Sequence, residues 1–92
     1  MNNLSLPEES NIENVDVNTG NNVTLFNDNS HTFNEVTDQL MLAIQCDERT
    51  AFRLVFLVDK NGSAIVFSGS IDECVRVSNI LELIGLKTSI SI

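Results

Sequence analysis

Apolar residues recur along the first part of the chain with two different periods. The run Val23 to Phe26 is rich in β-prone residues and predicts a strand, which is followed by turn-forming residues at positions 27–30. Thr32 and Glu35 have the spacing of a capping box, in which each side chain bonds the backbone amide of the other residue. Apolar residues then follow a helical period, at positions 33, 36, 40, 43 and 44. The pattern therefore predicts a helix that begins after Thr32 and ends near Gln45.

A second helix is predicted between two polar breaks. Asp47 is a suitable N-cap, and Gly62 suits the left-handed position that follows the end of a helix. The segment between them is almost wholly apolar toward its end, so we expect it to be deeply buried. Its apolar residues are Ala51, Phe52, Leu54, Val55 and Val58. The next run, Ala64 to Phe67, predicts a strand that is apolar on both faces and is broken by Gly69.

The last part of the chain contains one more helix and one more strand. Ser70 and Glu73 form a second capping box, and Gly85 closes the helix that follows. One stripe of that helix carries Cys74, Val77, Leu81 and Ile84. The final segment alternates, with Leu86, Thr88, Ile90 and Ile92 on one face, as in a half-buried strand. The order β-α-α-β-α-β predicts an α+β, two-layer fold in which a three-stranded sheet is covered by helices on one face.

The first 22 residues differ from the rest of the sequence. They contain seven Asn, four acidic residues and no basic residue, and their few aliphatic residues show no sustained period. Such a segment buries too little apolar area to offset the entropy of an ordered chain. We therefore predict a disordered, acidic and Asn-rich tail over residues 1–22 and one folded domain over residues 23–92.

The net charge of the chain indicates which kinds of partner it can bind. Thirteen acidic residues against five basic ones give a formal net charge of −8, which argues against binding to nucleic acid or to an anionic membrane surface. The longest apolar runs, Leu40 to Ile44 and Leu54 to Val58, are too short to cross a bilayer. The N-terminus has no basic residue and no apolar core of a signal peptide. We expect a cytoplasmic, monomeric protein with protein partners and with reduced thiols at Cys46 and Cys74.

The residues suited to catalysis or metal binding are few. His31 is the one histidine, and both cysteines lie near apolar stretches, where a small buried core residue is the simpler interpretation. A metal site would have to use Asn27, Asp28 and Asn29 with His31, but this cluster lacks the calcium-loop pattern and a second histidine. No Gly-rich phosphate loop is present. The sequence therefore predicts a non-enzymatic binding module without a metal or other cofactor, and a thiol enzyme built on Cys46 or Cys74 is the alternative.

The turn after the first strand carries a resemblance to a known family. The stretch Leu25-Phe26-Asn27-Asp28-Asn29-Ser30-His31-Thr32-Phe33, followed by Val36, resembles the N-D-D signature of ClpS adaptors. Further residues fall at spacings that fit the same family, namely Ala51, Val58, Gly62, Ala64, Gly69, Glu73, Gly85, Leu86 and Ile90. The resemblance covers residues 23–92 and implies a ClpS-like fold with an antiparallel sheet.

The resemblance also implies a function. ClpS proteins are adaptors of the Clp protease, and they bind an AAA+ unfoldase of the ClpA or ClpC type. They deliver substrates whose first residue is Leu, Phe, Tyr or Trp, and their N-terminal extension takes part in the transfer. A free N-terminus presents an ammonium group, which needs acceptors and a balancing carboxylate, and the side chain beside it needs an apolar cavity.

The residues for this site are carried over one by one. Asn27 and Asp28 match the family, whereas Asn29 stands where the second Asp is usual and Asp59 stands where the family has a His. Two interpretations follow: Asp59 supplies the charge that Asn29 lacks, or the chain is a ClpS-like interaction scaffold that has lost recognition of the amine. The resemblance places the apolar pocket at Phe33, Val36, Val55, Val58 and Thr88. His31 is either an exposed loop residue or a contact to the backbone of the bound peptide.

Overall fold

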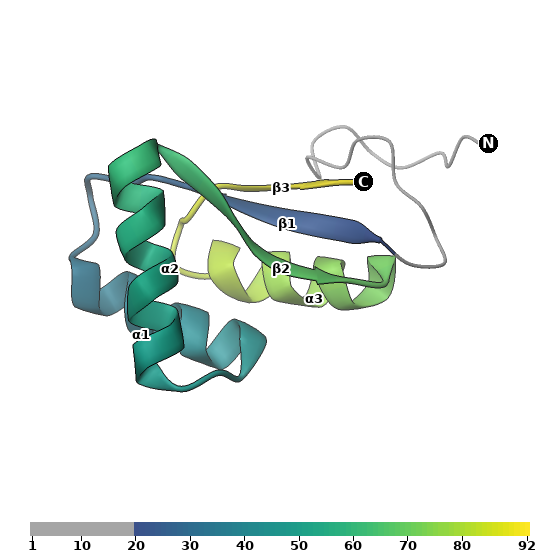
Figure 1. The fold of residues 1–92 in the computed structure, drawn as a ribbon, viewed down its shortest axis with the longest axis horizontal. Helices are drawn as coiled ribbons and strands as arrows, with labels where there is room; N and C mark the ends of the chain where they lie inside the picture. Colours follow the sequence, from purple (N-terminus) through teal and green to yellow (C-terminus); the bar gives the residue numbers. More distant parts are fainter. Residues whose placement is uncertain (1–19) are drawn as a thin grey trace.

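The computed structural model describes residues 20–92, and these form the predicted order of elements (Figure 1). The elements are β1 (Asn21–Phe26), α1 (Phe33–Ile44), α2 (Glu48–Asn61), β2 (Ser63–Gly69), α3 (Ile71–Glu82) and β3 (Thr88–Ser91). The strands make one sheet in the order β2-β1-β3, and both pairs are antiparallel. The predicted α+β class is confirmed.

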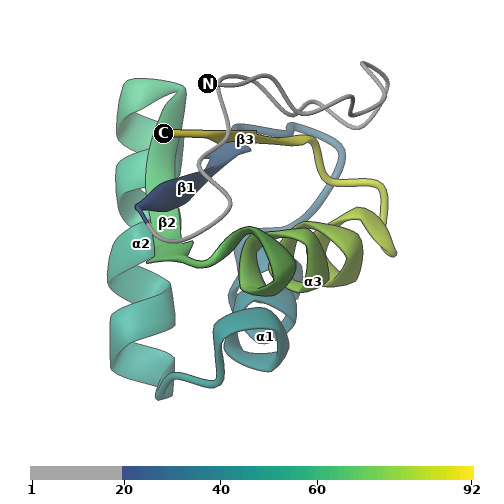
Figure 2. The ribbon, with the colours of Figure 1, turned by 90° about the vertical axis from the view of Figure 1, so that its right-hand side faces the viewer.

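The helices build outward from the central strand of the sheet. Helix α3 contacts all three strands, as Figure 2 shows, whereas α1 packs against α3 and α2. Helix α2 packs beside β2. Alternate residues of β1 and β3 point into the space between the sheet and the helices, and there Val23, Leu25, Thr88 and Ile90 are buried. This arrangement brings the end of β1, the start of α1 and the end of α2 to the same edge of the molecule.

Each helix begins where its side-chain cap predicts. The amide of Glu35 donates to Oγ1 of Thr32 at 3.1 Å, and the amide of Thr32 donates to the carboxylate of Glu35 at 2.8 Å. Ser70 and Glu73 form the second capping box, at the start of α3. Asp47 caps α2 by accepting from the amide of Thr50 at 2.9 Å. Hydrogen bonding from the side chain of Thr50, and then from this amide, lowers the pKa of Asp47.

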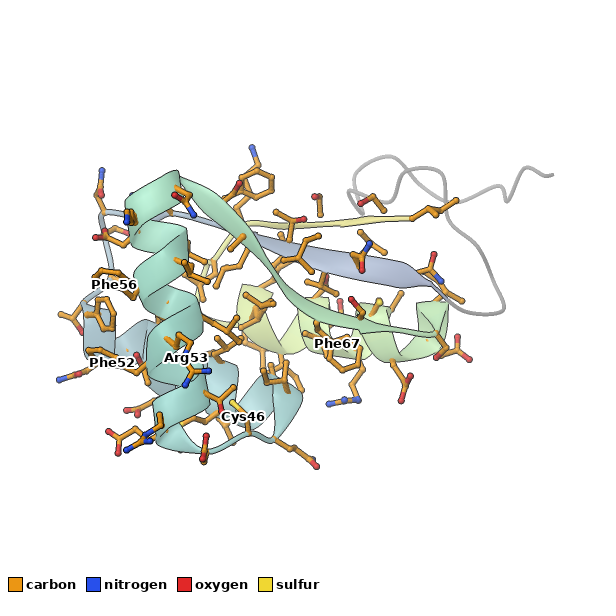
Figure 3. The ribbon with its side chains drawn as sticks, in the orientation of Figure 1. Cys46, Phe52, Arg53, Phe56 and Phe67 are labelled. Carbon is orange, nitrogen blue, oxygen red and sulfur yellow. The ribbon has the colours of Figure 1, made fainter. Side chains whose placement is uncertain are left out.

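The expectation of a deeply buried second helix is wrong. In α2 only Ala51, Val55 and Val58 are buried, and they form a single stripe. Phe52 and Phe56 are each 52% exposed and point away from the core (Figure 3). The reason is that α2 lies at the edge of the fold, beside β2 and α1, so that one face of the helix has no neighbouring element.

The first strand begins earlier than expected. Asn21 and Asn22, placed in the tail by the sequence pattern, belong to β1 and pair with Gly69 and Ser68. The hydroxyl of Ser68 donates to Oδ1 of Asn22 at 2.5 Å. The polar side chains of these two residues gave no indication of a strand, but their backbone groups are satisfied by pairing with β2. The rest of the predicted tail, residues 1–19, lies outside the described residues.

Strand β2 contains one irregularity. Val23 pairs with Phe67 and Thr24 pairs with Ile65, so Val66 is an extra residue with no partner opposite it in β1. Val66 is buried, whereas Ile65 lies on the exposed face of the sheet rather than inside. Ile84 lies beyond the end of α3 but still packs against the core, whereas Ile92 is exposed and does not lie on the buried face predicted for it. Among residues 20–92, no helix has the length and apolar character that a membrane span requires.

Candidate functional site

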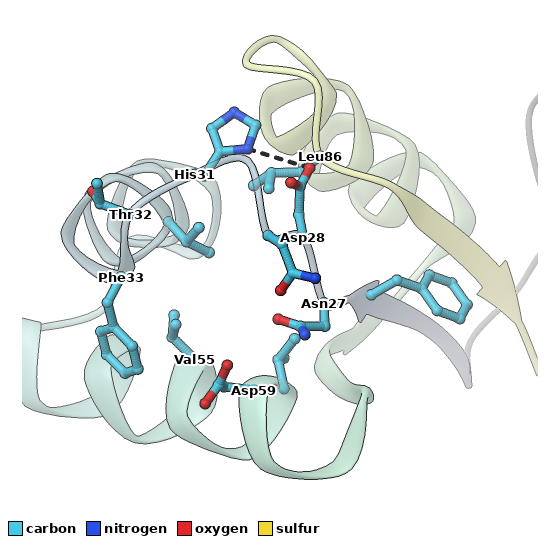
Figure 4. A pocket seen from close by; sticks show the side chains of 12 residues that line it. Asn27, Asp28, His31, Thr32, Phe33, Val55, Asp59 and Leu86 are labelled. Carbon is cyan, nitrogen blue, oxygen red and sulfur yellow. Dashed lines mark ion pairs between the residues drawn. The ribbon is translucent and has the colours of Figure 1, made fainter.

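A pocket of about 200 Å³ lies where the loop after β1 faces the C-terminal half of α2 (Figure 4). It combines an apolar interior with polar side chains from the loop and from α2. Its lining residues are Phe26, Asn27, Asp28, Asn29, His31, Thr32, Phe33, Val36, Val55, Val58, Asp59 and Leu86. The pocket therefore unites the N-D-N turn, the first turns of α1 and one face of α2.

One backbone hydrogen bond closes the end of α2, and a second one holds the loop against that end. Gly62 has a φ of 88° and donates its amide to the carbonyl of Val58 at 2.8 Å, which closes the helix in a left-handed cap. The carbonyl of Gly62 accepts from the amide of Asn27 at 2.9 Å. The last turn of α2, which carries Asp59, is thereby fixed next to the first residue of the loop.

The interior of the pocket is aliphatic. Val36 from α1 and Val55 and Val58 from α2 are buried side chains that also belong to the core of the fold. Phe33 stands at the start of α1, and its ring centroid lies 4.8 Å from that of Phe52, at a tilt of 50° between the ring planes. The pocket wall is thus fixed by core packing on one side and by an aromatic pair on the other.

Asp28 organises the loop through its own hydrogen bonds. Its Oδ1 accepts from the amide of Ser30 at 2.7 Å and from the hydroxyl of Ser30 at 2.5 Å, which makes an Asx turn. Its Oδ2 lies 3.2 Å from Nδ1 of His31. These hydrogen bonds, those from Ser30 most of all, lower the pKa of Asp28, so the carboxylate is ionised at neutral pH.

His31 connects the loop to the segment between α3 and β3. Its Nε2 donates to the carbonyl of Ile84 at 2.5 Å, while Nδ1 faces Asp28. Desolvation by itself lowers the pKa of His31, but the bond to Ile84 and the nearby Asp28 outweigh it, and the net pKa is raised. The ring is half-buried, and both of its nitrogens face protein partners, Ile84 and Asp28. These contacts position the loop.

Asp59 differs from Asp28 in its surroundings. It is exposed on the last turn of α2, and its side chain makes no hydrogen bond or ion pair to any of residues 20–92. Figure 4 shows its carboxylate across the pocket from the His31–Asp28 pair. Of the two carboxylates that line the pocket, Asp59 is therefore the one whose oxygens are available to an incoming group.

The structure brings together all but one of the predicted site residues. Asn27, Asp28, Asn29 and Asp59 line one pocket together with His31, and so do the predicted apolar residues Phe33, Val36, Val55 and Val58. The placement of Thr88 in the pocket is wrong: it is fully buried in β3, and its hydroxyl bonds Ser78 Oγ at 3.0 Å and Glu82 Oε2 at 2.7 Å. Its side chain is directed toward α3 and not toward the loop.

Three lining residues were missed. Phe26 and Thr32 flank the turn, and their position beside it in the sequence was a usable signal. Leu86 comes from the opposite end of the chain, and no local pattern marked it as a neighbour of the loop. The hydrogen bond between His31 and Ile84 brings it there.

The cysteines lack the environment of a reactive thiol. Cys74 is buried and its Sγ lies 3.5 Å from the carbonyl of Asn21, while Cys46 is half-buried. Burial raises the pKa of both thiols, which disfavours the nucleophilic thiolate, and His31 is engaged with Ile84 and Asp28. Within the described part of the chain, no three His, Cys, Asp or Glu side chains are grouped as metal ligands would be.

The fold and the pocket together describe a small α+β domain that has an apolar cavity with carboxylates at its mouth. Residues 18–87 match the family described as ATP-dependent Clp protease adaptor protein ClpS. The match covers most of the chain, and the chain belongs to this family of Clp protease adaptors. An adaptor family agrees with the expectation of a non-catalytic protein.

Two individual proteins show the range of the similarity. The chain is 33% identical over 58 residues to the E3 ubiquitin-protein ligase UBR1 of Drosophila melanogaster, and the matched segment is 63% of this chain but only 3% of UBR1. The structure of Agrobacterium tumefaciens ClpS2 bound to L-phenylalaninamide superposes with a TM-score of 0.74, at 22% identity over 79% of this chain and 95% of ClpS2. The second likeness shows that the two proteins share a fold.

Proposed function

We propose that this protein binds the free N-terminus of proteins whose first residue is Leu, Phe, Tyr or Trp and delivers them to an AAA+ Clp ATPase. The observation that carries the proposal is that Asn27 and Asp59, from different elements, line the same pocket as Val36, Val55 and Val58. An N-terminal residue has the same two parts, a cationic amine and an apolar side chain on one Cα atom. The pocket is divided in the same way.

The amine is held by acceptors at the mouth. An α-ammonium has three N–H donors and one positive charge, and burying it requires both hydrogen-bond acceptors and a negative charge. Asp59 provides the available carboxylate, and the amide oxygens of Asn27 and Asn29 provide neutral acceptors. Asp28, which is bonded to Ser30 and His31, shapes the loop and adds a second negative charge nearby.

The side chain enters the aliphatic interior. Full burial of a Leu or Phe side chain stabilises a complex by about 1.5–3 kcal/mol, which is enough to separate bulky apolar residues from Gly or Ala. L-Phenylalaninamide, the ligand of Agrobacterium ClpS2, joins a free α-amine to a benzyl side chain on one carbon. The shared fold supports the same division of labour in this chain.

The test uses a short fluorescent peptide that begins with Phe and a second peptide that differs only by N-acetylation. We expect the free amine to bind at least ten-fold more tightly in fluorescence anisotropy, because acetylation removes the charge and two donors. Equal affinities for the two peptides would contradict recognition of the amine. Pull-down with a Clp ATPase of the ClpA or ClpC type, with and without the peptide, tests delivery.

A second function is favoured by one observation. The carboxylate oxygens of Asp28 are already engaged by Ser30 and His31, so Asp59 is the one lining carboxylate that has no hydrogen-bond partner among residues 20–92. A ClpS-like interaction scaffold, which docks on the Clp ATPase without reading N-termini, needs no free acceptor at this position. Retention of the Clp ATPase in the pull-down together with no binding of the free-amine peptide would support this second function.

A further inference from the structure

Two exposed aromatic rings lie beside the pocket and take no part in the core. Phe52 and Phe56 are one helical turn apart on α2, each is 52% exposed, and Figure 3 shows both on the same side of the helix. We call them the aromatic ridge. Adjacent exposed aromatic side chains of this size are typical of a contact surface.

The ridge is continuous with the pocket at both of its ends. Phe52 packs on Phe33, which lines the pocket, with 4.8 Å between the ring centroids. Phe56 precedes Asp59 by three residues, a separation that places two side chains next to each other on a helix, about 5–6 Å apart at Cβ. The ridge therefore runs along α2 from the apolar rim of the pocket to the carboxylate at its mouth.

We propose that the aromatic ridge binds the side chain of the second residue of the captured N-terminus and selects an apolar residue there. The inference rests on the proposed function, which fixes the first residue with its amine at Asp59. The Cα atom of the next residue is about 3.8 Å further along the peptide. Phe56 is the neighbour of Asp59 on the same helix face, so it is within reach of that second side chain.

The chemistry of the surroundings decides which second residue fits. The opposite side of the mouth carries the polar loop at residues 27–32, and the ridge is an exposed apolar surface next to the amine site. An acidic second residue would approach the negative charge of Asp59, and neither ring offers it a hydrogen-bond donor. A glycine would leave both rings exposed to water.

The experiment compares peptides that begin Phe-Leu, Phe-Gly and Phe-Asp and are otherwise identical. We expect the full-length protein to bind Phe-Leu about five-fold more tightly than Phe-Gly, with Phe-Asp the weakest. In Phe56→Ala the preference for Leu over Gly falls below about two-fold, while the affinity for Phe-Gly is unchanged. The control is Leu42→Ala, which removes a side chain that is 64% exposed on α1 and lies outside the pocket, and it keeps the full preference.

A second variant reverses the selection. Phe56→Lys places a cation at the same position, and we expect it to prefer Phe-Asp over Phe-Leu. Equal affinities of the unmodified protein for Phe-Leu and Phe-Gly, both dependent on a free amine, would overturn the ridge subsite and leave the proposed function standing. No binding of either peptide would overturn both. Self-association that Phe56→Ala abolishes, without a second-residue preference, would assign the ridge to another copy of the chain.

Discussion

His31 and Ile84, which are 53 positions apart, are joined by a hydrogen bond from the imidazole Nε2 to the main-chain carbonyl. The same ring faces the carboxylate of Asp28 through Nδ1 at 3.2 Å. One side chain thus holds the binding loop against the segment that leads into β3. The shape of the pocket mouth depends on this contact, since Asn27, Asp28 and Asn29 all belong to the loop.

The stability of the protein should depend on the ionisation of His31. The pKa of His31 is raised above its ordinary value of 6.5, so the folded chain holds this proton more tightly than the unfolded chain does. Its contribution is complete below about pH 6.5 and is lost as the pH rises through the pKa of the folded state. Urea unfolding between pH 5.5 and 8.5 measures this loss, which His31→Gln should remove.

Asp28→Asn separates the two causes of the raised pKa. We expect the pKa of His31 to fall in this variant, because the carboxylate that favours the imidazolium is gone while the bond to Ile84 remains. Since the chain has a single histidine, one imidazole resonance in an NMR titration reports the pKa directly. An unchanged pKa in Asp28→Asn would contradict the ion pair.

Asp59 should carry most of the charge recognition at the mouth. Asp59→Asn keeps the shape of the side chain but removes its charge, and we expect affinity for a free-amine Phe peptide to fall on the order of ten-fold. The affinity of the unmodified protein should also weaken with added salt more steeply than that of the variant. Asp38→Asn is the matched control, because Asp38 is an exposed acid on α1 outside the pocket. Isothermal titration calorimetry checks both variants.

The size of the pocket should determine which first residue fits. Val55 is 5% exposed and lines the interior, so Val55→Met fills part of the cavity of about 200 Å³. We expect affinity for a Phe peptide to fall about five-fold relative to a Leu peptide, because the benzyl group is the larger. Val66→Met enlarges an equally buried valine outside the pocket, and it should leave this ratio unchanged.

Thr88 should matter for stability and not for binding. Thr88→Val keeps the volume of the side chain but breaks its bonds to Ser78 and Glu82, and we expect a loss of about 1–2 kcal/mol in the free energy of unfolding. The affinity for a Phe peptide should stay within two-fold of the original, because Thr88 is absent from the pocket lining. Urea denaturation and fluorescence anisotropy on the same sample separate the two effects. A large change in affinity would return Thr88 to the site.

The features that the sequence predicted well depend on local chemistry. The caps at Thr32, Asp47 and Ser70 act within a single helical turn, so their spacing alone located three helix starts. The turn after β1 was predicted from its own residues, but the assignment of Asn27, Asp28, Asn29 and Asp59 to one binding site came from the family resemblance. The spacing of residues along the chain also does not predict the order of the strands in the sheet, because that order depends on contacts between distant segments.

The errors come from packing between distant elements. The apolar composition of α2 did not reveal that Phe52 and Phe56 face outward, since exposure depends on whether another element covers that side of the helix. The alternating pattern placed Thr88 correctly on the inner face of β3, but only the position of α3 shows that this face meets Ser78. Leu86 reaches the pocket through a contact with a loop more than fifty residues earlier in the chain.

Because Val66 has no partner opposite it in β1, the position of α3 depends on the number of residues in β2. With this extra residue, two consecutive residues, Val66 and Phe67, both contribute to the hydrophobic cluster beneath the sheet. Deleting one residue at this point would restore strict alternation, but it would also move Ser70, the N-cap of α3, back along β2 by the length of one residue. A variant that lacks this extra residue would therefore need a connection before α3 that is one residue longer.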